Sequence, residues 1–308
     1  MKYLKVVLIL LFIAVPLVVF GAQAGAVKKA KTIDELAKMY DSTPCKECHA
    51  EIYVEWEKSL HARSMYGPLN TGRTGATFKT TIENGLKDWP HSGVKKPEDV
   101  GIEHLQLCTK CHLPQLEDAE ESVAKEIVKN VYAFADQQDE KAAENLQKLN
   151  IGCTICHGRN AIIHKWTYGS PDPKAVYGTK DGEHADAKYP KMKKSPYMKA
   201  SILCGQCHGM GPNFELKNPT QCATLYGSHL FAYIPEAGEA KPCQECHMKA
   251  SKLGHNMQSY RSPEMAKLAV DFHVEAYAHQ WRDVVTTTPQ AQVTVELKNN
   301  AGHAIPDG

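Results

Sequence analysis

The sequence lacks an excess of charge of one sign and, beyond its first residues, it lacks long hydrophobic runs. Lys and Arg number 36 and Asp and Glu 35, which gives a formal net charge of +1 over 308 residues. This balance excludes the global basic signature of a nucleic-acid-binding protein. Aliphatic clusters are thin, whereas there are 21 Gly and 17 Pro. Side-chain burial alone would make one large domain or two modest ones marginally stable, so another apolar component must contribute to the core.

The N-terminus has the pattern of a secretory signal peptide. Two lysines precede the uncharged run Val6–Phe20, and Ala22 and Ala24 form an A-x-A cleavage signal. The run is short for a membrane span, which needs about 20 apolar residues, and no cysteine that could carry a lipid anchor precedes Cys45. We expect residues 1–24 to be removed and the mature protein to be exported to the periplasm or the cell surface, with no stable membrane span. An uncleaved N-terminal anchor is the alternative.

Cysteine is abundant, with 11 residues, and ten of them form five copies of the motif C-x-x-C-H. The thiols are Cys45, Cys48, Cys108, Cys111, Cys153, Cys156, Cys204, Cys207, Cys243 and Cys246, and the histidines that follow them are His49, His112, His157, His208 and His247. In this spacing two thiols add to the two vinyl groups of one haem, and the adjacent histidine reaches the iron from the same face.

The motif therefore predicts five c-type haems, with these five histidines as proximal iron ligands. Zinc sites and thioredoxin-like redox pairs give no reason for a histidine after every second cysteine. Cys222 is left over, and we expect it to be a small buried residue.

Ten histidines lie outside the motifs, and five haems need at most five of them as second iron ligands. The supply permits two histidines on every iron, an arrangement that closes the metal to substrate and suits electron transfer. A five-coordinate haem is also compatible with the count. The distal candidates are His61, His164, His229, His255, His273, His104 and His303. His91 and His184 lie in polar, turn-rich stretches and are expected at the surface.

Residues 45–62, with the sequence CKECHAEIYVEWEKSLHA, resemble the opening of multihaem cytochromes of the cytochrome c-554 and hydroxylamine oxidoreductase superfamily. The C-H-G and C-H-M forms of the later motifs are also similar, and the resemblance covers about residues 45 to 255. It implies that His61 is the distal ligand of a different haem from the one attached just before it. The chain has five attachment sites, whereas the octahaem enzymes have eight, and it has no C-x-x-C-K motif for a lysine-ligated catalytic haem. The resemblance supports the fold more than an enzyme activity.

Local patterns predict mainly helices and loops before residue 285. A capping box at Thr32–Glu35 predicts a short helix to about Tyr40. Apolar residues at three- and four-residue steps between Leu116 and Leu149 predict one long helix or two stacked ones. Residues 164–198 are rich in Gly, Pro, Asp and Lys, and we expect a long loop over the haems. Pro263–Val285 is predicted to be a helix with His273 on its inward stripe.

After Pro289 polar and apolar residues alternate, which predicts a half-buried strand at residues 292–298. A single strand cannot pair its backbone alone, so either the chain is truncated within a β domain, which we favour, or the strand joins a sheet elsewhere or on a partner. The predicted fold is mainly α with extensive loops. A multihaem cytochrome c domain over residues 25–285 packs around five covalently bound haems, and residues 286–308 begin a C-terminal β domain.

The favoured function is electron transport in anaerobic-type respiration along mostly bis-histidine haems. The expected partners are redox proteins, such as a quinol-oxidising membrane complex or other multihaem cytochromes, and no nucleic acid. One alternative is an oxidoreductase acting on a small nitrogen or sulfur compound at one open haem, with Arg159 and Tyr168 as candidates for proton delivery. A second alternative is a subunit of an extracellular cytochrome filament. No catalytic residue is assigned.

Overall fold

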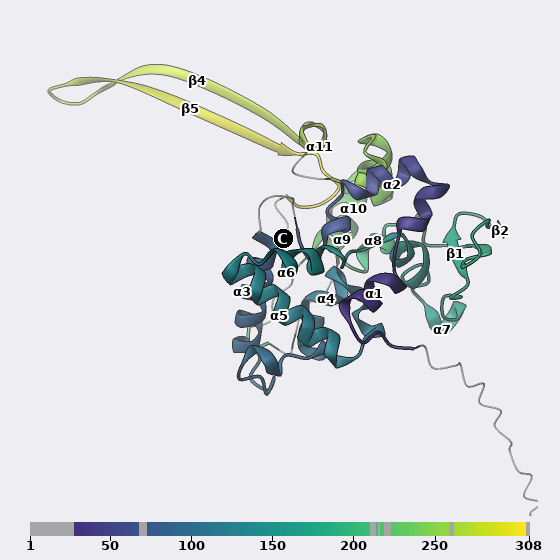
Figure 1. The fold of residues 1–308 in the computed structure, drawn as a ribbon. Helices are drawn as coiled ribbons and strands as arrows, with labels where there is room; N and C mark the ends of the chain where they lie inside the picture. Colours follow the sequence, from purple (N-terminus) through teal and green to yellow (C-terminus); the bar gives the residue numbers. More distant parts are fainter. Residues whose placement is uncertain are drawn as a thin grey trace, which may run out of the picture.

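A helical body with one projecting β-hairpin makes up the part of the chain that the computed structural model describes (Figure 1). The described residues are 28–67, 73–209, 214, 216–218, 223–258 and 262–305, with the side chains of residues 73–77 left aside. The predicted signal peptide, residues 1–24, and Cys222 lie outside them. The expectation of helices and loops followed by β structure at the C-terminus is confirmed at this level.

The helices are short, apart from three in the first half of the chain. They are α1 (Ile33–Met39), α2 (Ala50–Glu57), α3 (Arg73–Asp88), α4 (Ile102–His112), α5 (Glu121–Gln137), α6 (Glu140–Gln147), α7 (Lys165–Tyr168), α8 (Ile202–Gly205), α9 (Leu225–Ser228), α10 (Ile234–Ala237) and α11 (Pro263–Ala269). Single helical turns are η1 (Thr43–Glu47), η2 (His61–Arg63), η3 (Pro97–Asp99), η4 (Pro114–Asp118), η5 (Ile155–Arg159), η6 (His229–Tyr233), η7 (Glu245–Ala250) and η8 (Gly254–Asn256).

The conventional hydrophobic core lies among α1 and α3 to α6. Leu36, Val131 and Leu146 are among its fully buried members. The predicted helix after Thr32 is confirmed as α1, because the Thr32 hydroxyl accepts a hydrogen bond from the Glu35 amide at 3.1 Å. Each buried aliphatic side chain contributes about 1.5–3 kcal/mol relative to exposure. This half of the body is therefore stabilised in the ordinary way.

The helical stretch after Leu116 consists of two packed helices, the second of the two arrangements expected. The chain turns between α5 and α6 at Gln138, which has φ of 56°. Asp139 then caps α6 by accepting a hydrogen bond from the Ala142 amide at 2.7 Å.

The second half of the body has few buried hydrophobic residues. A small cluster joins Ala161, Ile162, Ala175 and Tyr177. Beyond Tyr197, no hydrophobic residue in the described ranges is buried, although two of the C-x-x-C-H motifs lie there. A chain segment that must order its backbone without burying apolar surface lacks the main favourable contribution to folding.

The predicted loop over residues 164–198 contains a small sheet, so the loop prediction is wrong in part. The strands β1 (Ala175–Gly178), β2 (Gly182–Glu183) and β3 (Lys191–Lys194) are arranged in the order β1-β3-β2. β1 pairs in parallel with β3, and β2 pairs antiparallel with it.

The predicted helix at Pro263–Val285 is wrong beyond Ala269, where α11 ends and β4 (Val270–Arg282) begins. β4 pairs antiparallel with β5 (Thr287–Asn299), which contains the predicted strand at 292–298. From Phe272 onwards apolar and polar residues also alternate with a period of two. Opposite these residues, Leu297, Val295 and Val293 extend one apolar face across both strands. This cross-strand pairing outweighs the weaker helical stripe.

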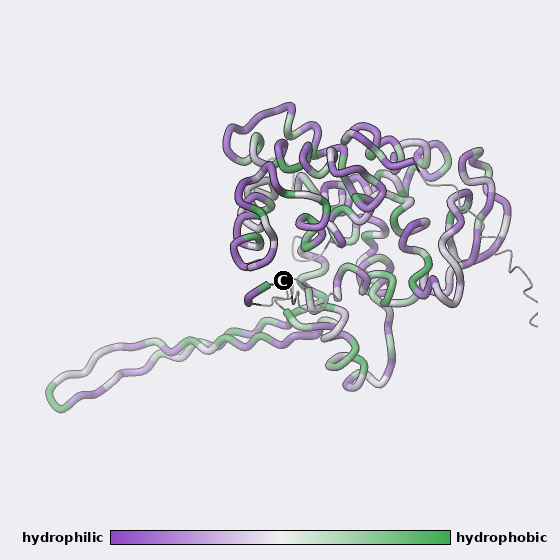
Figure 2. Tube along the Cα trace, turned by 90° about the horizontal axis from the view of Figure 1, so that it is seen from below, coloured by the Kyte–Doolittle hydropathy of each residue, from purple (hydrophilic) through white to green (hydrophobic). Residues whose placement is uncertain are grey.

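The hairpin extends away from the body, and both hydrophobic and hydrophilic residues are exposed along it (Figure 2). His273 lies on β4 and is exposed, with its ring nitrogen 3.1 Å from Glu275. The structure therefore corrects the expectation that His273 points inward from a helix.

Stability should depend on the helical core and very little on the hairpin. We expect Leu146→Ala to lower the free energy of unfolding by about 2–5 kcal/mol, because it leaves a cavity among α1, α5 and α6. Val274→Ala on the exposed hairpin should cost less than about 1 kcal/mol. Urea unfolding followed by far-UV circular dichroism compares the two, and equal losses would contradict this assignment of the core.

Candidate functional site

Four of the five motif histidines face a histidine from outside the motifs. We number the motifs in chain order as sites 1 to 5, which end at His49, His112, His157, His208 and His247. The ring centres lie 6.3, 6.3, 6.2 and 6.2 Å apart in the pairs His49–His184, His157–His255, His208–His61 and His247–His303. The other aromatic ring pairs of the described chain have centres 5.3 to 6.1 Å apart. The four histidine pairs are therefore the widest, and they are uniform.

This spacing fits one metal ion held between two imidazoles. A metal–imidazole nitrogen bond is about 2.0–2.1 Å, as for zinc, and the ring centre lies about 1.1 Å behind the nitrogen, so the two centres are about 6.3 Å apart. The ring planes are inclined by between 9° and 87°. Ligation tolerates this range because each ring rotates about its own metal–nitrogen bond. The residues thus fit the two axial positions of a haem iron.

Three of the distal candidates from sequence, His61, His255 and His303, are in these pairs. The fourth partner is His184, which the sequence placed at the surface because of its polar surroundings. Its amide donates to the Pro190 carbonyl at 3.0 Å, so the turn between β2 and β3 holds it in front of His49. The small sheet that carries His184 gave no clear signal in the sequence. His184 is also far from site 1 along the chain, so nothing local linked it to His49.

Backbone carbonyls fix the tautomer of two of these rings. A carbonyl only accepts hydrogen bonds, so the contact from Nδ1 of His184 to Tyr189 at 2.9 Å requires a proton on Nδ1. The same reasoning applies to His157 and the Tyr177 carbonyl of β1, at 2.8 Å. In both histidines Nε2 is left unprotonated and able to bind a metal, the usual second-shell arrangement of a histidine ligand.

Helix α2 organises two of the partner histidines. Its Glu55 accepts a hydrogen bond from the His255 amide at 2.9 Å and lies 3.6 Å from the ring Nδ1. Its Trp56 donates from the indole to the Ile151 carbonyl at 3.0 Å, and the Ile151 amide donates to the His61 carbonyl at 2.9 Å. Helix α2 thus helps to place His255 beside site 3 and His61 beside site 4.

Site 2 differs from the other four. All fifteen histidines lie within the described residues, and none of their rings is paired with His112. Phe78 of α3 lies edge-on against His112 at 5.3 Å, and Nδ1 of His112 donates to the Ser64 carbonyl at 3.2 Å. His112 therefore has its Nε2 available but no second histidine opposite.

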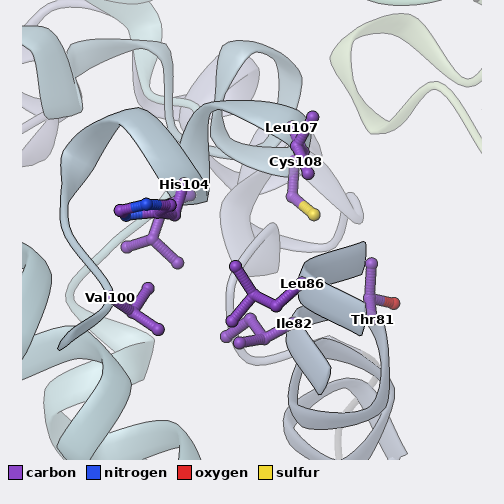
Figure 3. A pocket seen from close by; sticks show the side chains of 8 residues that line it. Thr81, Ile82, Leu86, Val100, His104, Leu107 and Cys108 are labelled. Carbon is purple, nitrogen blue, oxygen red and sulfur yellow. The ribbon is translucent and has the colours of Figure 1, made fainter. Parts of the chain in front are cut away.

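A small apolar pocket lies between α3 and α4 beside site 2 (Figure 3). Thr81, Ile82 and Leu86 of α3 line one side of it, and Val100 with His104, Leu107 and Cys108 of α4 line the other. Around Cys207 of site 4, by contrast, the lining is polar and includes Lys110, Arg159 and Lys165. Apolar walls suit a porphyrin ring, and cations suit its propionate carboxylates.

The other distal candidates are not brought to a motif histidine. Both ring nitrogens of His104 are engaged, since Nδ1 accepts from the Gly101 amide at 3.0 Å and Nε2 donates to the Ser92 carbonyl at 2.9 Å. His164 lies against the rings of Trp166 and Tyr197. His229 is buried and bonded to the Gly302 carbonyl, and His273 is on the hairpin.

Thiols from different motifs lie side by side. Three such pairs are within hydrogen-bonding distance: Cys45 with Cys153, Cys111 with Cys207, and Cys204 with Cys243. The pKa of the Cys204 thiol is raised by its hydrogen bond with the Cys243 thiol, by burial and by nearby Cys156. Site 1 therefore adjoins site 3, site 3 adjoins site 4, and site 4 adjoins both site 2 and site 5.

In the part of the chain that the structure describes, no three His, Cys, Asp or Glu side chains converge on a free-ion site. A haem takes four iron ligands from its own porphyrin, so its iron needs only one or two side chains of the protein. No protein-family model, curated protein or solved structure matches this chain. No helix among the described residues is both long and apolar enough for a membrane span.

Stability should fall as the pH is lowered through the histidine range. Burial, and then the nearby His208 and His112, lower the pKa of His61 to about 4 from its ordinary value of 6.5. In the unfolded chain His61 is protonated below about pH 6.5, whereas in the folded chain it stays neutral down to about pH 4. This difference stabilises the folded state by on the order of 3 kcal/mol. The stabilisation is fully present above pH 6.5, the ordinary pKa, and is lost as the pH falls toward about 4, the pKa in the folded chain.

The urea midpoint measured between pH 7.5 and 5 checks this expectation. We expect it to decrease steadily, and His279→Gln on the exposed hairpin should keep the same slope. A midpoint that is constant or rises over this range would contradict the burial of neutral histidines.

Proposed function

We propose that this chain is an exported multihaem c-type cytochrome that carries five haems and passes electrons between redox partner proteins. The observation that carries the proposal is the set of four histidine pairs. Each joins one motif histidine to one histidine from elsewhere, with centres 6.2–6.3 Å apart. Chance contacts would not select motif histidines four times at a single spacing.

Bound haem supplies one-electron chemistry at iron, and the residues of the chain determine how that iron is held. The motif thiols would anchor the group covalently. The paired imidazoles at sites 1, 3, 4 and 5 would hold the iron between two histidines and leave no position open to a substrate. Carbonyls such as those of Tyr177 and Tyr189 fix ring orientation and tautomer.

The scarcity of buried hydrophobic residues beyond Tyr197 supports the same conclusion. Sites 4 and 5 lie in that segment, among helices of four residues. Large apolar macrocycles fixed by thioether bonds and iron ligands would supply the missing core, as metal ions do in small metal-dependent domains.

The neighbouring thiols support an electron carrier in particular. Thiol contacts join site 1 to site 3, site 4 to site 5 and site 2 to site 4. Cys156 of site 3 lies near both thiols of site 4, which places sites 1, 3, 4 and 5 in series. Sites 1 and 5 are then the two ends of the series. Cys48 at site 1 is exposed, whereas the other nine motif thiols are partly buried. A path with an exposed end suits exchange of electrons with a docked partner.

His112 favours a second candidate, an oxidoreductase acting on a small nitrogen or sulfur compound at site 2. The proposed proton-delivery residues do not strengthen it. Arg159 is paired with Asp118 at 2.6 Å and with Glu117, and Tyr168 is 57% exposed. The filament alternative would be favoured by a haem that takes its second histidine from another copy of the chain. At four sites this chain supplies both rings of the pair itself.

The proposal predicts that each chain binds five haems and takes up five electrons on full reduction. Haem content is measured by the pyridine haemochrome method, and electrons by coulometric titration of the same sample. The carrier function predicts rapid electron exchange with small redox proteins and no turnover of nitrite or hydroxylamine. Fewer than five haems would contradict the site assignment, and turnover would favour the enzyme.

Replacing His184 tests the partner that the sequence missed. We expect His184→Ala to convert one low-spin haem to high-spin in the electron paramagnetic resonance spectrum, because His49 loses its opposite ring. His164→Ala is the matched control, and its spectrum should be unchanged. The pairing is wrong if His164→Ala, and not His184→Ala, produces the high-spin haem.

A further inference from the structure

We propose that His229 is a positioning residue that seats His303 opposite His247 at site 5. The inference rests on the proposed function, and it assigns His229 a role other than that of an iron ligand. Its basis is a set of hydrogen bonds that join both halves of site 5 through one buried imidazole.

On one side the ring holds the turn that carries His303. Nδ1 of His229 donates to the carbonyl of Gly302, the residue just before His303, at 2.9 Å. His229 is 6% exposed, and its ring stacks on Tyr233 with centres 5.3 Å apart and planes inclined by 18°. Packing therefore fixes the ring, and the carbonyl fixes its tautomer.

On the other side the ring reaches the attachment segment of site 5. Because Nδ1 carries the proton, Nε2 accepts from the hydroxyl of Ser201 at 3.4 Å. The same hydroxyl oxygen accepts a hydrogen bond from the Cys243 amide at 3.1 Å. One imidazole thus connects the backbone of the first haem-attachment thiol of site 5 with the turn that bears the second iron ligand.

The turn needs such an anchor because it follows the projecting hairpin. Between α11 and the turn the chain runs out along β4 and back along β5, and the Asn300 amide closes the base on the Ala269 carbonyl at 2.8 Å. A second bond, from the Ala304 amide to the Ser228 hydroxyl at 3.2 Å, ties the turn to the residue beside His229. His229 and Ser228 therefore form a latch on either side of His303.

The test compares His229→Phe, which keeps the ring bulk but has no donor, with His229→Asn, whose amide donates from about the position of Nδ1. His303→Ala defines the spectrum of an open site 5, and His279→Phe on the hairpin is the control. Each variant is examined as the full haem-loaded chain by electron paramagnetic resonance and redox potentiometry. Haem content is measured in each sample.

We expect His303→Ala and His229→Phe each to show one more high-spin haem than the unaltered protein, and His229→Asn to restore the low-spin count. If His229→Phe fails to load five haems, Ser228→Ala takes its place. Ser228→Ala removes the hydroxyl that accepts from the Ala304 amide. In the reduced protein, carbon monoxide should then bind at site 5, in addition to site 2, at a rate at least about threefold higher, because His303 leaves the iron more often.

Three outcomes would overturn the inference. His229→Phe with unchanged spin states and potentials would show that the latch is not needed, as would an unchanged carbon monoxide rate in Ser228→Ala. A high-spin site 5 in His229→Asn, combined with a low-spin site 5 in His303→Ala, would make His229 the ligand itself. If the unaltered protein binds no haem, the proposed function fails and not merely this inference.

Discussion

Much of the described chain is arranged around four gaps between histidine rings, each wide enough for one metal ion. The rings of a pair come from segments far apart in the sequence, such as His61 with His208 and His49 with His184. The rings of His157 and His184 donate hydrogen bonds to backbone carbonyls, and the Glu55 carboxylate lies 3.6 Å from the His255 ring. These contacts hold the rings in place. Burial lowers the pKa of several of these rings, namely His61, His208, His247 and His255. Iron ligation would use the lone pairs of such neutral imidazoles.

The two halves of the body are stabilised differently. Helices α1 and α3 to α6 bury a continuous aliphatic core, so this half has an ordinary hydrophobic basis. Sites 4 and 5 lie beyond Tyr197, where no hydrophobic residue of the described ranges is buried, and a thiol of site 4 there lies beside a thiol of site 5. Covalent haem would serve this half as both core and cross-link, so that folding there depends on cofactor attachment.

The sequence was informative where chemistry dictates a fixed spacing. Five C-x-x-C-H motifs predicted the attachment residues. Of the histidines that local settings favoured as second ligands, His61 and His255 face motif histidines, whereas His164 and His229 do not. His184 could not be selected from its local setting, because a two-residue strand and a turn bring it to His49, and such short elements have no periodicity. Residues 270–282 carried a helical and a strand pattern at once. Pairing with β5, a contact between distant residues, decided between them. The position of His229 beside Gly302 likewise depends on the return of the hairpin, which no local pattern reveals.

The most direct test of this account is an iron-edge anomalous diffraction map from crystals of the haem-loaded protein. The account predicts five iron peaks. Four should lie midway between the rings of the pairs at sites 1, 3, 4 and 5, and the fifth should be bound by His112 with no second histidine opposite. Peaks that are missing from the gaps, or metal held by the motif thiols without a porphyrin, would contradict it.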